Sequence, residues 1–372
     1  MSIVIFILVI VALILVHEFG HFIAAKIAGM RVDEFGIGFP PRALTIAKKG
    51  DTSYTLNWIP FGGFVSIFGE NAEAKDAKSA PRRPEDAGRA FTDKNRFAQA
   101  CVLIAGVTMN MVFAYVLIVA ALISGTPRAL TAEELPRAEN PVLSIAAILP
   151  GSPAERAGLQ FGDSILTAKS TQGVWQEADA ESFTAFMAET HGAEVDLTVK
   201  RGEKTIALTA TPDQGVVAAD PERFALGVSV ASVGVVPLPV PEAIVEGSYL
   251  TWGSTTATAA GLYHFFAGIF TFNADLSQVS GPIGIAGAVG SASASGLGNL
   301  FALMALISIN LAIINLLPIP ALDGGRLLFV GIEALTRRSV PPAVVRTVHG
   351  ASFIFLIGLM VVITVSDVFK LF

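Results

Sequence analysis

Four long apolar segments constrain the fold of this chain more than any other feature. They cover residues 3–25, 97–124, 297–317 and 348–365, and each is long enough to cross a hydrocarbon core about 30 Å thick. The composition agrees, because 52% of the 372 residues are hydrophobic and only 15% are charged. We therefore predict a polytopic α-helical membrane protein with about four transmembrane helices.

Charge and cysteine content exclude two other classes of protein. The net charge of −6 argues against a nucleic-acid-binding protein. The partner that the apolar segments predict is the lipid bilayer. Cys101 is the single cysteine, which excludes an internal disulfide framework. The first apolar segment lacks a basic start and a small-residue cleavage site, so we expect it to be retained as a transmembrane helix.

Lysine and arginine predict how the chain crosses the membrane. Residues 26–96 hold twelve of them in 71 positions, whereas the longer stretch 125–296 holds eight. Because positive loops stay inside, we expect the first loop to be cytoplasmic and the second to be exported, in a plasma (inner) membrane protein. The first and third segments then end on the same, cytoplasmic side. Side chains near those two ends can meet at a similar depth.

The pentapeptide HEFGH at positions 17–21 closes the first apolar run and indicates chemistry. Two histidines four residues apart lie on one helix face, about one turn apart. Neutral imidazoles at that spacing can hold one Zn²⁺, and an adjacent Glu18 can deprotonate the water that the metal activates. Ionisable side chains in a membrane helix are expensive and usually functional. This favours His17 and His21 as metal ligands over two histidines that merely pack in a helix bundle.

A catalytic zinc site keeps three protein ligands, and the end of the third apolar segment supplies a candidate for the third. Asp323 is the only carboxylate there. Pro318 and Pro320 interrupt a regular helix, and Gly324 and Gly325 permit unusual backbone angles beside the carboxylate. Irregular backbone at membrane depth must be buried or line a wet cavity. The alternative is that Asp323 only caps a helix.

Three motifs together resemble the site-2 protease family of intramembrane zinc metalloproteases, and in particular its bacterial RseP type. They are HEFGH in the first segment, GVTMN at positions 106–110 in the second, and NLLPIPALDGG at 315–325 in the third. The resemblance covers nearly the whole chain. One departure is the missing proline after Gly106, where the family usually has Gly-Pro-x-x-Asn.

The resemblance implies roles for individual residues. It implies one Zn²⁺ per chain held by His17, His21 and Asp323, with Glu18 as the general base. It also implies that Asn310 and Asn315 face the active site, with Asn315 the better candidate to bind the substrate backbone or an oxyanion. An amide donor aimed at developing negative charge in a dry site would stabilise it strongly.

The exported loop contains a stretch, residues 148–166, that resembles a PDZ domain, and we assign this domain to residues 140–230. The residue pattern predicts a strand, a short helix and a second strand, then an amphipathic helix at 180–190 and two further strands. PDZ folds bind extended peptide by strand addition, so we expect this domain to gate or select substrate. The alternative is an inert spacer.

Three further regions have weaker signals. Residues 54–68 are apolar and rich in strand formers with Gly62 and Gly63 in the middle, which predicts a re-entrant β-hairpin near the active site. The family has such a hairpin, which is thought to present the unwound substrate. Residues 238–296 are predicted as interfacial helices and a connector, with a further membrane hairpin as an alternative. Residues 71–93 are predicted as a flexible cytoplasmic loop.

By resemblance, the expected activity is cleavage of transmembrane segments in regulated intramembrane proteolysis. Substrates would be single-span membrane proteins that an upstream site-1-type protease has already trimmed, such as anti-sigma factors or remnant signal peptides. Two alternatives are a membrane metal transporter that uses the same three ligands and a catalytically silent PDZ scaffold. The intact HEFGH motif with Glu18 and Asp323 argues against the scaffold, and Glu18 argues against the transporter, because transport has no evident need for a base beside the first ligand.

Overall fold

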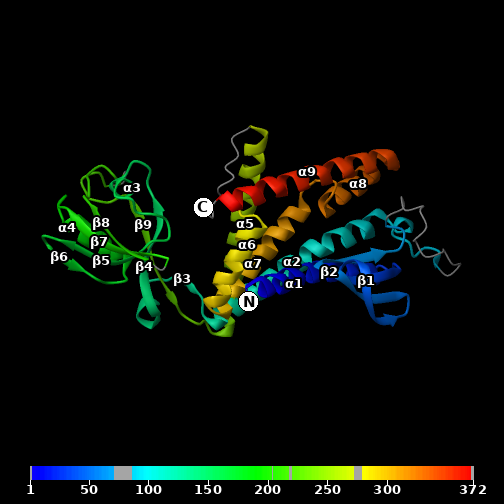
Figure 1. Cartoon of the computed structure of the whole chain (residues 1–372), viewed down its shortest axis with the longest axis horizontal. Helices are drawn as coiled ribbons and strands as arrows, with labels where there is room; N and C mark the ends of the chain where they lie inside the picture. The colour runs from blue at the N-terminus through cyan, green and yellow to red at the C-terminus, as the bar shows by residue number, and fades with distance from the viewer. Residues whose placement is uncertain (1, 71–85, 203, 218–219, 272–278, 370–372) are drawn as a thin grey trace. The chain divides into compact units, whose positions relative to one another are not determined.

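The computed structural model describes residues 2–70, 86–202, 204–217, 220–271 and 279–369. The chain divides into two compact units (Figure 1). Met1–Ile123 and Pro239–Phe372 together form the first, here called the membrane unit. Ser124–Leu238 form the second, here called the insert. The insert is wider than the predicted domain at residues 140–230, because strands that close its sheet lie outside those limits.

Four helices among the described residues are long and apolar enough to cross a membrane, which confirms the four predicted segments. They are α1 (Ser2–Ile27), α2 (Arg96–Ser124), α7 (Leu297–Leu316) and α9 (Pro342–Phe369). The last helix extends well beyond the predicted limits of 348–365. The chain is therefore a multi-pass membrane protein.

The end of α1 is set by a glycine. Gly29 adopts the left-handed conformation with φ at +65°, which a residue with a side chain rarely adopts. The Gly29 amide donates to the Lys26 carbonyl at 3.0 Å, and the Met30 amide donates to the Ala25 carbonyl at 2.8 Å. This pair of hydrogen bonds is the Schellman arrangement that ends helices. It turns the chain from α1 directly into the first strand.

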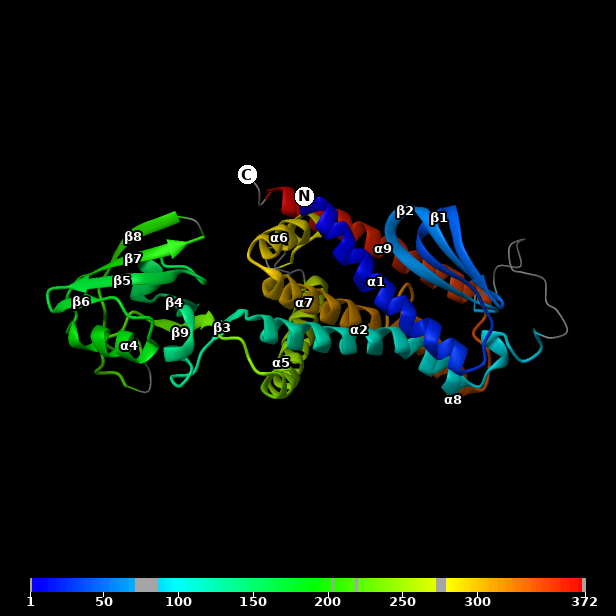
Figure 2. The same cartoon turned by 90° about the horizontal axis from the view of Figure 1, so that it is seen from below.

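The region predicted as several interfacial helices has a simpler structure. Helix α5 (Val240–Phe270) is one continuous 31-residue helix, so the described part contains no internal membrane hairpin. Residues 272–278 lie outside the described part of the chain. Helix α6 (Pro282–Ala294) then packs against α1, α7 and α9, and Figure 2 shows it beside the start of α1.

The β-hairpin of the membrane unit is larger than predicted. Strand β1 (Val32–Lys49) pairs with strand β2 (Thr52–Ile67) around a turn at Gly50, whose φ is +60°. The prediction of a hairpin confined to residues 54–68 was wrong, because those residues form most of β2 alone. The partner strand was missed because it contains charged residues and two prolines, which hide its apolar positions.

The hairpin curls onto α1. Phe35 of β1 lies opposite both Tyr54 and Val65 of β2, so the long strands fold over on themselves. The ring of Phe22 on α1 packs edge-on against Phe35 and Tyr54, with centroids 5.4 Å and 6.1 Å away. These aromatic contacts fix the sheet beside the helix turn that follows His21.

The predicted loop at residues 71–93 is described only from residue 86 onward, and that part is packed rather than loose. The carboxylate of Asp86 is 1% exposed and forms an ion pair with Arg31, which is itself 2% exposed. The amide of Phe91 donates to the Phe68 carbonyl at 2.7 Å. This segment therefore closes the base of the hairpin, whereas residues 71–85 lie outside the described residues.

The insert is built on one antiparallel sheet in the order β3-β9-β4-β5-β7-β8, with β6 paired to β5. Two helices pack with this sheet, α3 (Pro153–Arg156) and α4 (Ala180–Glu189). The seven strands are β3 (Pro127–Ala129), β4 (Glu139–Ile148), β5 (Ser164–Ser170), β6 (Gly173–Trp175), β7 (Val195–Arg201), β8 (Lys204–Ala210) and β9 (Val228–Val235). The predicted strands and the predicted helix at 180–190 are all present. Strands β3, β6 and β9 were not predicted.

The core of the insert is that of a small water-soluble domain. Phe183 of α4 is 2% exposed and packs edge-on against Trp175, with ring centroids 5.0 Å apart. The side chain of Asp179 caps α4 by accepting from the Ser182 amide at 2.7 Å. The buried aliphatic side chains of the strands complete this core; they include Leu143, Ile145, Ile165, Val195, Leu197 and Val199.

Candidate metal centre

Three potential metal ligands from two distant parts of the chain meet in the membrane unit. The Nε2 atom of His17 lies 2.9 Å from Oδ2 of Asp323 and 3.1 Å from Nε2 of His21. Nε2 of His21 lies 3.2 Å from the same carboxylate oxygen. Both histidines are less than 10% exposed. Among the described residues, this is the one group of three His, Cys, Asp or Glu side chains close enough to hold a metal ion.

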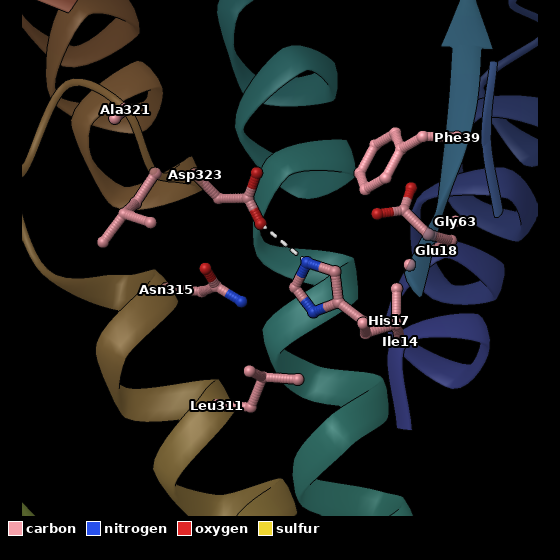
Figure 3. Close-up of a pocket in the computed structure, with 11 residues that line it drawn as sticks. Ile14, His17, Glu18, Phe39, Gly63, Leu311, Asn315, Ala321 and Asp323 are labelled. Carbon is pink, nitrogen blue, oxygen red and sulfur yellow. Dashed lines mark hydrogen bonds and ion pairs between the residues drawn. The ribbon is translucent and has the colours of Figure 1, made fainter. Parts of the chain in front are cut away.

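The meeting of α1 with the start of α8 (Asp323–Thr336) agrees with the expectation from the membrane crossings. Helix α7 ends at Leu316, and a six-residue connection brings Asp323 back to the level of the HEFGH turn. Figure 3 shows the Asp323 carboxylate directed at the His17 ring from the opposite side of the cavity. The 306 residues that separate the two in sequence make this contact purely tertiary.

The donor set fits Zn²⁺ in both chemistry and spacing. Four-coordinate zinc takes nitrogen and oxygen ligands at about 2.0–2.2 Å, which places neighbouring ligand atoms about 3.3 Å apart. The three observed separations are close to that value. In addition, Nδ1 of His21 lies 2.8 Å from the Val102 carbonyl, which can only accept a hydrogen bond. A neutral His21 therefore carries its proton on Nδ1, which leaves the lone pair of Nε2 directed at the ligand cluster.

Helix α2 leaves room for the two imidazoles through Gly106. A Cβ atom at this position would overlap with Nε2 of His21 and with the His17 ring. Gly20 of α1 has the matching role, because a Cβ there would overlap with the Ala105 carbonyl of α2. Two glycines thus allow the helices to cross closely enough for the histidines to lie over the backbone of α2. The sequence places a glycine in the second motif, but its partner rings are visible only in the structure.

Asn110 is a site residue that sequence reasoning did not assign. Its side chain has no exposed area, and its Nδ2 atom lies 3.2 Å from Nδ1 of His17. The hydroxyl of Ser308 on α7 donates to the Asn110 carbonyl at 2.8 Å. The signal that could have found Asn110 is an amide side chain in an uncharged membrane helix, four residues after Gly106, on the same helix face.

A cavity of about 420 Å³ opens beside the three ligands. Glu18 of α1 and Asn315 of α7 line it from two sides, and Figure 3 shows the Asn315 amide facing the His17 ring. The hairpin forms a third wall through Phe39, Gly62 and Gly63. The remaining lining residues are Ile14, His17, Leu311, Ala321, Leu322 and Asp323.

Asn310 does not lie where the resemblance implied. Its Nδ2 atom donates to the Leu306 carbonyl of its own helix at 3.0 Å, and it is not among the cavity-lining residues. The physical reason is helical geometry. Asn310 and Asn315 are five residues apart, which places them about 140° apart around α7. Only one of the two can point into the cavity.

The glycines after Asp323 have a different purpose from the one predicted. Gly324 and Gly325 do not have positive φ angles. Instead, a Cβ at Gly324 would overlap with the Leu316 carbonyl, and one at Gly325 would overlap with the Ile319 carbonyl. They are small because α8 folds back tightly onto the end of α7. The break that allows this turn falls at Leu317, which precedes Pro318 and has extended backbone angles.

The hairpin glycines also differ from one another. Gly62 has φ at +105°, a conformation that favours glycine, so it bends β2 at the cavity. Gly63 is small for reasons of space, since a Cβ there would lie 3.1 Å from the Gly36 carbonyl and 3.7 Å from Cγ of Glu18. The sheet therefore approaches Glu18 with bare backbone.

Outside the cluster, ion pairs tie α8 to neighbouring segments. Arg326 of α8 contacts Glu70, just after β2, at 2.8 Å, and Glu333 contacts Arg96 at the start of α2 at 2.8 Å. His349 of α9 lies 2.8 Å from the Pro320 carbonyl through its Nδ1 atom. The first two contacts anchor α8, which begins at Asp323, and the third anchors the connection that precedes it.

Comparison with known proteins points to one family. A sequence model described as peptidase family M50 matches residues 5–359. A putative zinc metalloprotease of Clostridium perfringens is 32% identical, over 96% of this chain and 95% of its own length. One of a Nostoc species is also 32% identical, over 100% and 97%. The zinc metalloprotease RasP of Oceanobacillus iheyensis is 29% identical, over 100% and 99%.

Proposed function

The chain belongs to peptidase family M50 and is a zinc metalloprotease, and we propose that it cuts peptide bonds within or beside transmembrane segments of single-span membrane proteins. The observation that carries this proposal is the position of the cavity. His17, Asp323, Glu18 and Asn315 line it, and His17, Glu18 and Asn315 lie on helices long and apolar enough to span a bilayer. Water-dependent chemistry at that place suits a substrate that is itself in the membrane.

The roles of the residues follow from their positions. His17, His21 and Asp323 would hold the Zn²⁺, which supplies a Lewis acid that polarises a carbonyl and acidifies water. Glu18 lines the cavity next to His17, so it can take a proton from the attacking water and return it to the leaving amine. Asn315 faces the same space and can donate its amide to the substrate backbone or to the developing oxyanion.

The hairpin supplies a way to hold an unwound substrate. A helical substrate hides its carbonyls in its own hydrogen bonds, so it must be extended before cleavage. The Gly63–Ile67 part of β2 pairs with β1 on one side, and Gly63 borders the cavity next to Glu18. An extended substrate could add to the other side as a further strand. That geometry would place its backbone within reach of Glu18.

Substitution in this strand tests the idea. We expect Ser66→Pro to reduce cleavage by at least about tenfold, because a proline lacks the backbone N–H and its ring disturbs an edge segment of a sheet. Ile46→Pro, at a residue that does not line the cavity, is the control for a proline in the same sheet. Zinc content measured in both variants reports whether the protein has folded. Unchanged cleavage by a folded Ser66→Pro variant would refute strand addition.

We further propose that the insert selects substrates by excluding those with bulky exported domains. Support comes from strand β9, which pairs with β3 at Val233–Val235, while the Leu130 amide donates to the Ser232 carbonyl and residues 228–231 have no neighbouring strand on that side among the described residues. A groove of about 540 Å³ lies between this edge and α4. An exposed edge beside a helix suits capture of extended peptide, as in the PDZ domains that this insert resembles.

Removal of the insert tests the filter. Pro127 lies opposite Val235 across β3 and β9, so residues 127–236 can be replaced by a short glycine–serine linker without pulling α2 and α5 apart. We expect the shortened protein to cleave substrates that still carry a large exported domain, which the full chain would leave intact. If both proteins refuse the untrimmed substrate equally, the insert is not a size filter.

The proposed substrates are membrane proteins that another protease has already shortened, such as anti-sigma factors or remnant signal peptides. The proposed orientation places residues 26–96 in the cytoplasm and the insert outside, as the twelve basic residues of the first loop favour. Fusion of a reporter enzyme to a site in residues 71–85 and to one in the insert would test this orientation.

The decisive experiment compares purified wild type with Glu18→Gln on a model single-span substrate, with bound zinc quantified in both. We expect cleavage to fall by about 10²-fold or more while zinc is retained, because the amide cannot accept the proton. Glu242→Gln on α5 is the control and should cleave normally. Equal cleavage by the Glu18→Gln variant would exclude Glu18 as the base. Metal uptake into vesicles without any cleavage would favour a transporter.

A further inference from the structure

Helix α2 presents two different polar partners to the two histidines of HEFGH. Val102, Gly106 and Asn110 follow one another at intervals of four residues, so they lie along one face of the helix. The carbonyl of Val102 accepts from Nδ1 of His21, and Asn110 lies against Nδ1 of His17. The first partner is a backbone atom that no substitution removes. The second is a side chain, which makes its chemistry testable.

The protonation that metal binding requires decides how Asn110 must be turned. Nε2 of His17 is the atom that faces Asp323 and His21, so a metal ion at this cluster takes the lone pair of Nε2. Nδ1 of the same ring must then carry the proton and needs an acceptor. In the structure, the NH₂ group of Asn110 lies 3.2 Å from Nδ1 of His17. If Nδ1 carries the proton, two hydrogen-bond donors face each other.

The other amide atom of Asn110 resolves this conflict. Its Oδ1 is buried and has no hydrogen-bond partner among the described residues. Rotation by a half-turn about the Cβ–Cγ bond exchanges the positions of the amide oxygen and nitrogen. The hydrogen-bond network decides which of the two orientations is adopted. A half-turn brings Oδ1 to Nδ1 of His17. The backbone of Asn110 is held meanwhile by the 2.8 Å hydrogen bond from Ser308.

We propose that Asn110 is a positioning residue that accepts a hydrogen bond from Nδ1 of His17 through Oδ1 and so fixes the tautomer and the ring orientation for metal binding. The inference rests on the proposed role of His17 as a metal ligand. Such outer partners of metal-binding histidines contribute about 10–100-fold to metal affinity. Asn110 touches neither substrate nor metal, and it acts only through His17.

Two near-isosteric substitutions separate an acceptor from a donor. Asn110→Asp keeps oxygen acceptors toward Nδ1 in either orientation, so we expect zinc affinity within about threefold of wild type. Asn110→Leu leaves the Nδ1 proton buried without a partner, so we expect about 10–100-fold weaker zinc binding. Zinc affinity is measured in detergent by competition with a chelator of known affinity. The visible absorption spectrum of the Co²⁺-substituted proteins reports ligand geometry independently of turnover.

The outcomes distinguish failure of this inference from failure of the ligand assignment. His17→Ala should lose zinc; if it does not, His17 is not a ligand. If His17→Ala loses zinc while Asn110→Leu binds it as tightly as wild type, or Asn110→Asp binds more weakly than Asn110→Leu, Asn110 is not the acceptor. Asn299→Ala on α7 is the matched asparagine control, because its amide donates to the Ser295 carbonyl at the end of α6 and not to a histidine. Should Asn110→Leu fail to fold, Asn110→Ala replaces it with the same expectation.

Discussion

The membrane unit and the insert differ in where their large apolar side chains lie. The insert encloses Phe183 and Leu197, which are at most 2% exposed, between its sheet and its helices. In the membrane unit, α9 exposes large apolar residues such as Ile354 (73%), whereas Asn110 and Ser308 have no exposed area. In a bilayer, lipid solvates the apolar surface of the membrane unit, much as water solvates the polar surface of a soluble domain.

The difference changes what a buried polar residue indicates. In the insert, buried Asp163 pairs with Arg201, and buried Ser152 caps α3, so both stabilise local structure. In the described helices of the membrane unit, four of the six buried polar residues gather at one point, namely His17, His21, Asn110 and Ser308, and they contact one another across three helices. Within a bilayer such residues are expensive, so their convergence marks a site.

The largest effect is expected where the membrane unit has no spare space. Gly106→Ala would push a Cβ atom into both imidazoles, so we expect zinc affinity and cleavage to fall by about 100-fold or more. Gly253→Ala on α5 has open space around it and should behave as wild type. Zinc quantification after dialysis against a chelator, together with a cleavage assay, checks both. Normal zinc binding by Gly106→Ala would mean that α1 and α2 can separate freely, against the close packing described here.

A core truncation in the insert should leave the zinc site untouched. Leu197→Ala removes a side chain that is 1% exposed, which we expect to destabilise the insert by about 2–5 kcal/mol. Hydrogen exchange of insert peptides should rise, while zinc affinity stays at the wild-type value because the two units have separate cores. Val174→Ala, at an exposed position of the same sheet, is the control. Loss of zinc from the Leu197→Ala protein would contradict the independence of the units.

The Asp163–Arg201 pair makes the stability of the insert depend on pH. Two hydrogen bonds of 2.7 Å from Arg201 hold the pKa of Asp163 below its usual value of about 3.9. A carboxylate with a lowered pKa stabilises the folded state above its unfolded pKa and loses this contribution as the pH falls through the folded pKa. We therefore expect Arg201→Met to weaken protection from hydrogen exchange at pH 7, and the difference from wild type to shrink below about pH 4. A difference that stays constant with pH would exclude this ion pair as the cause.

The smallest effect is expected at the edge of the membrane unit. Glu333 and Arg96 form an ion pair between α8 and α2, but Arg96 is 42% exposed. Solvent screening limits such pairs to about 0–1 kcal/mol. Glu333→Gln should therefore change zinc affinity by less than about threefold, measured by the same chelator competition. A loss as large as that of Gly106→Ala would show that the anchoring of α8, rather than the packing of α1 on α2, controls the site.

Local patterns predicted the elements well where one residue type dominates over many positions. The spans of α1, α2 and α7 follow directly from their uninterrupted apolar runs. Helix α4 follows from its amphipathic pattern, and the flanking strands follow from their strand-forming residues. In contrast, β1 was missed because its pairing with β2 compensates for the charges and prolines that it contains. Strand β9 was missed although its valines at positions 228, 230, 233 and 235 are typical of a strand.

The site divides in the same way. The placement of His17, Glu18 and His21 on neighbouring positions of one helix is a consequence of helical periodicity, so the sequence by itself determined it. The sequence also determined the choice of metal chemistry, since two histidines and a carboxylate suit zinc. The membrane crossings already predicted that Asp323 comes near the two histidines, but its contact distances, the exclusion of Asn310 and the roles of Gly106 and Asn110 were decided only by the tertiary structure. Those contacts depend on how helices cross, and crossing depends on side chains far apart in the chain.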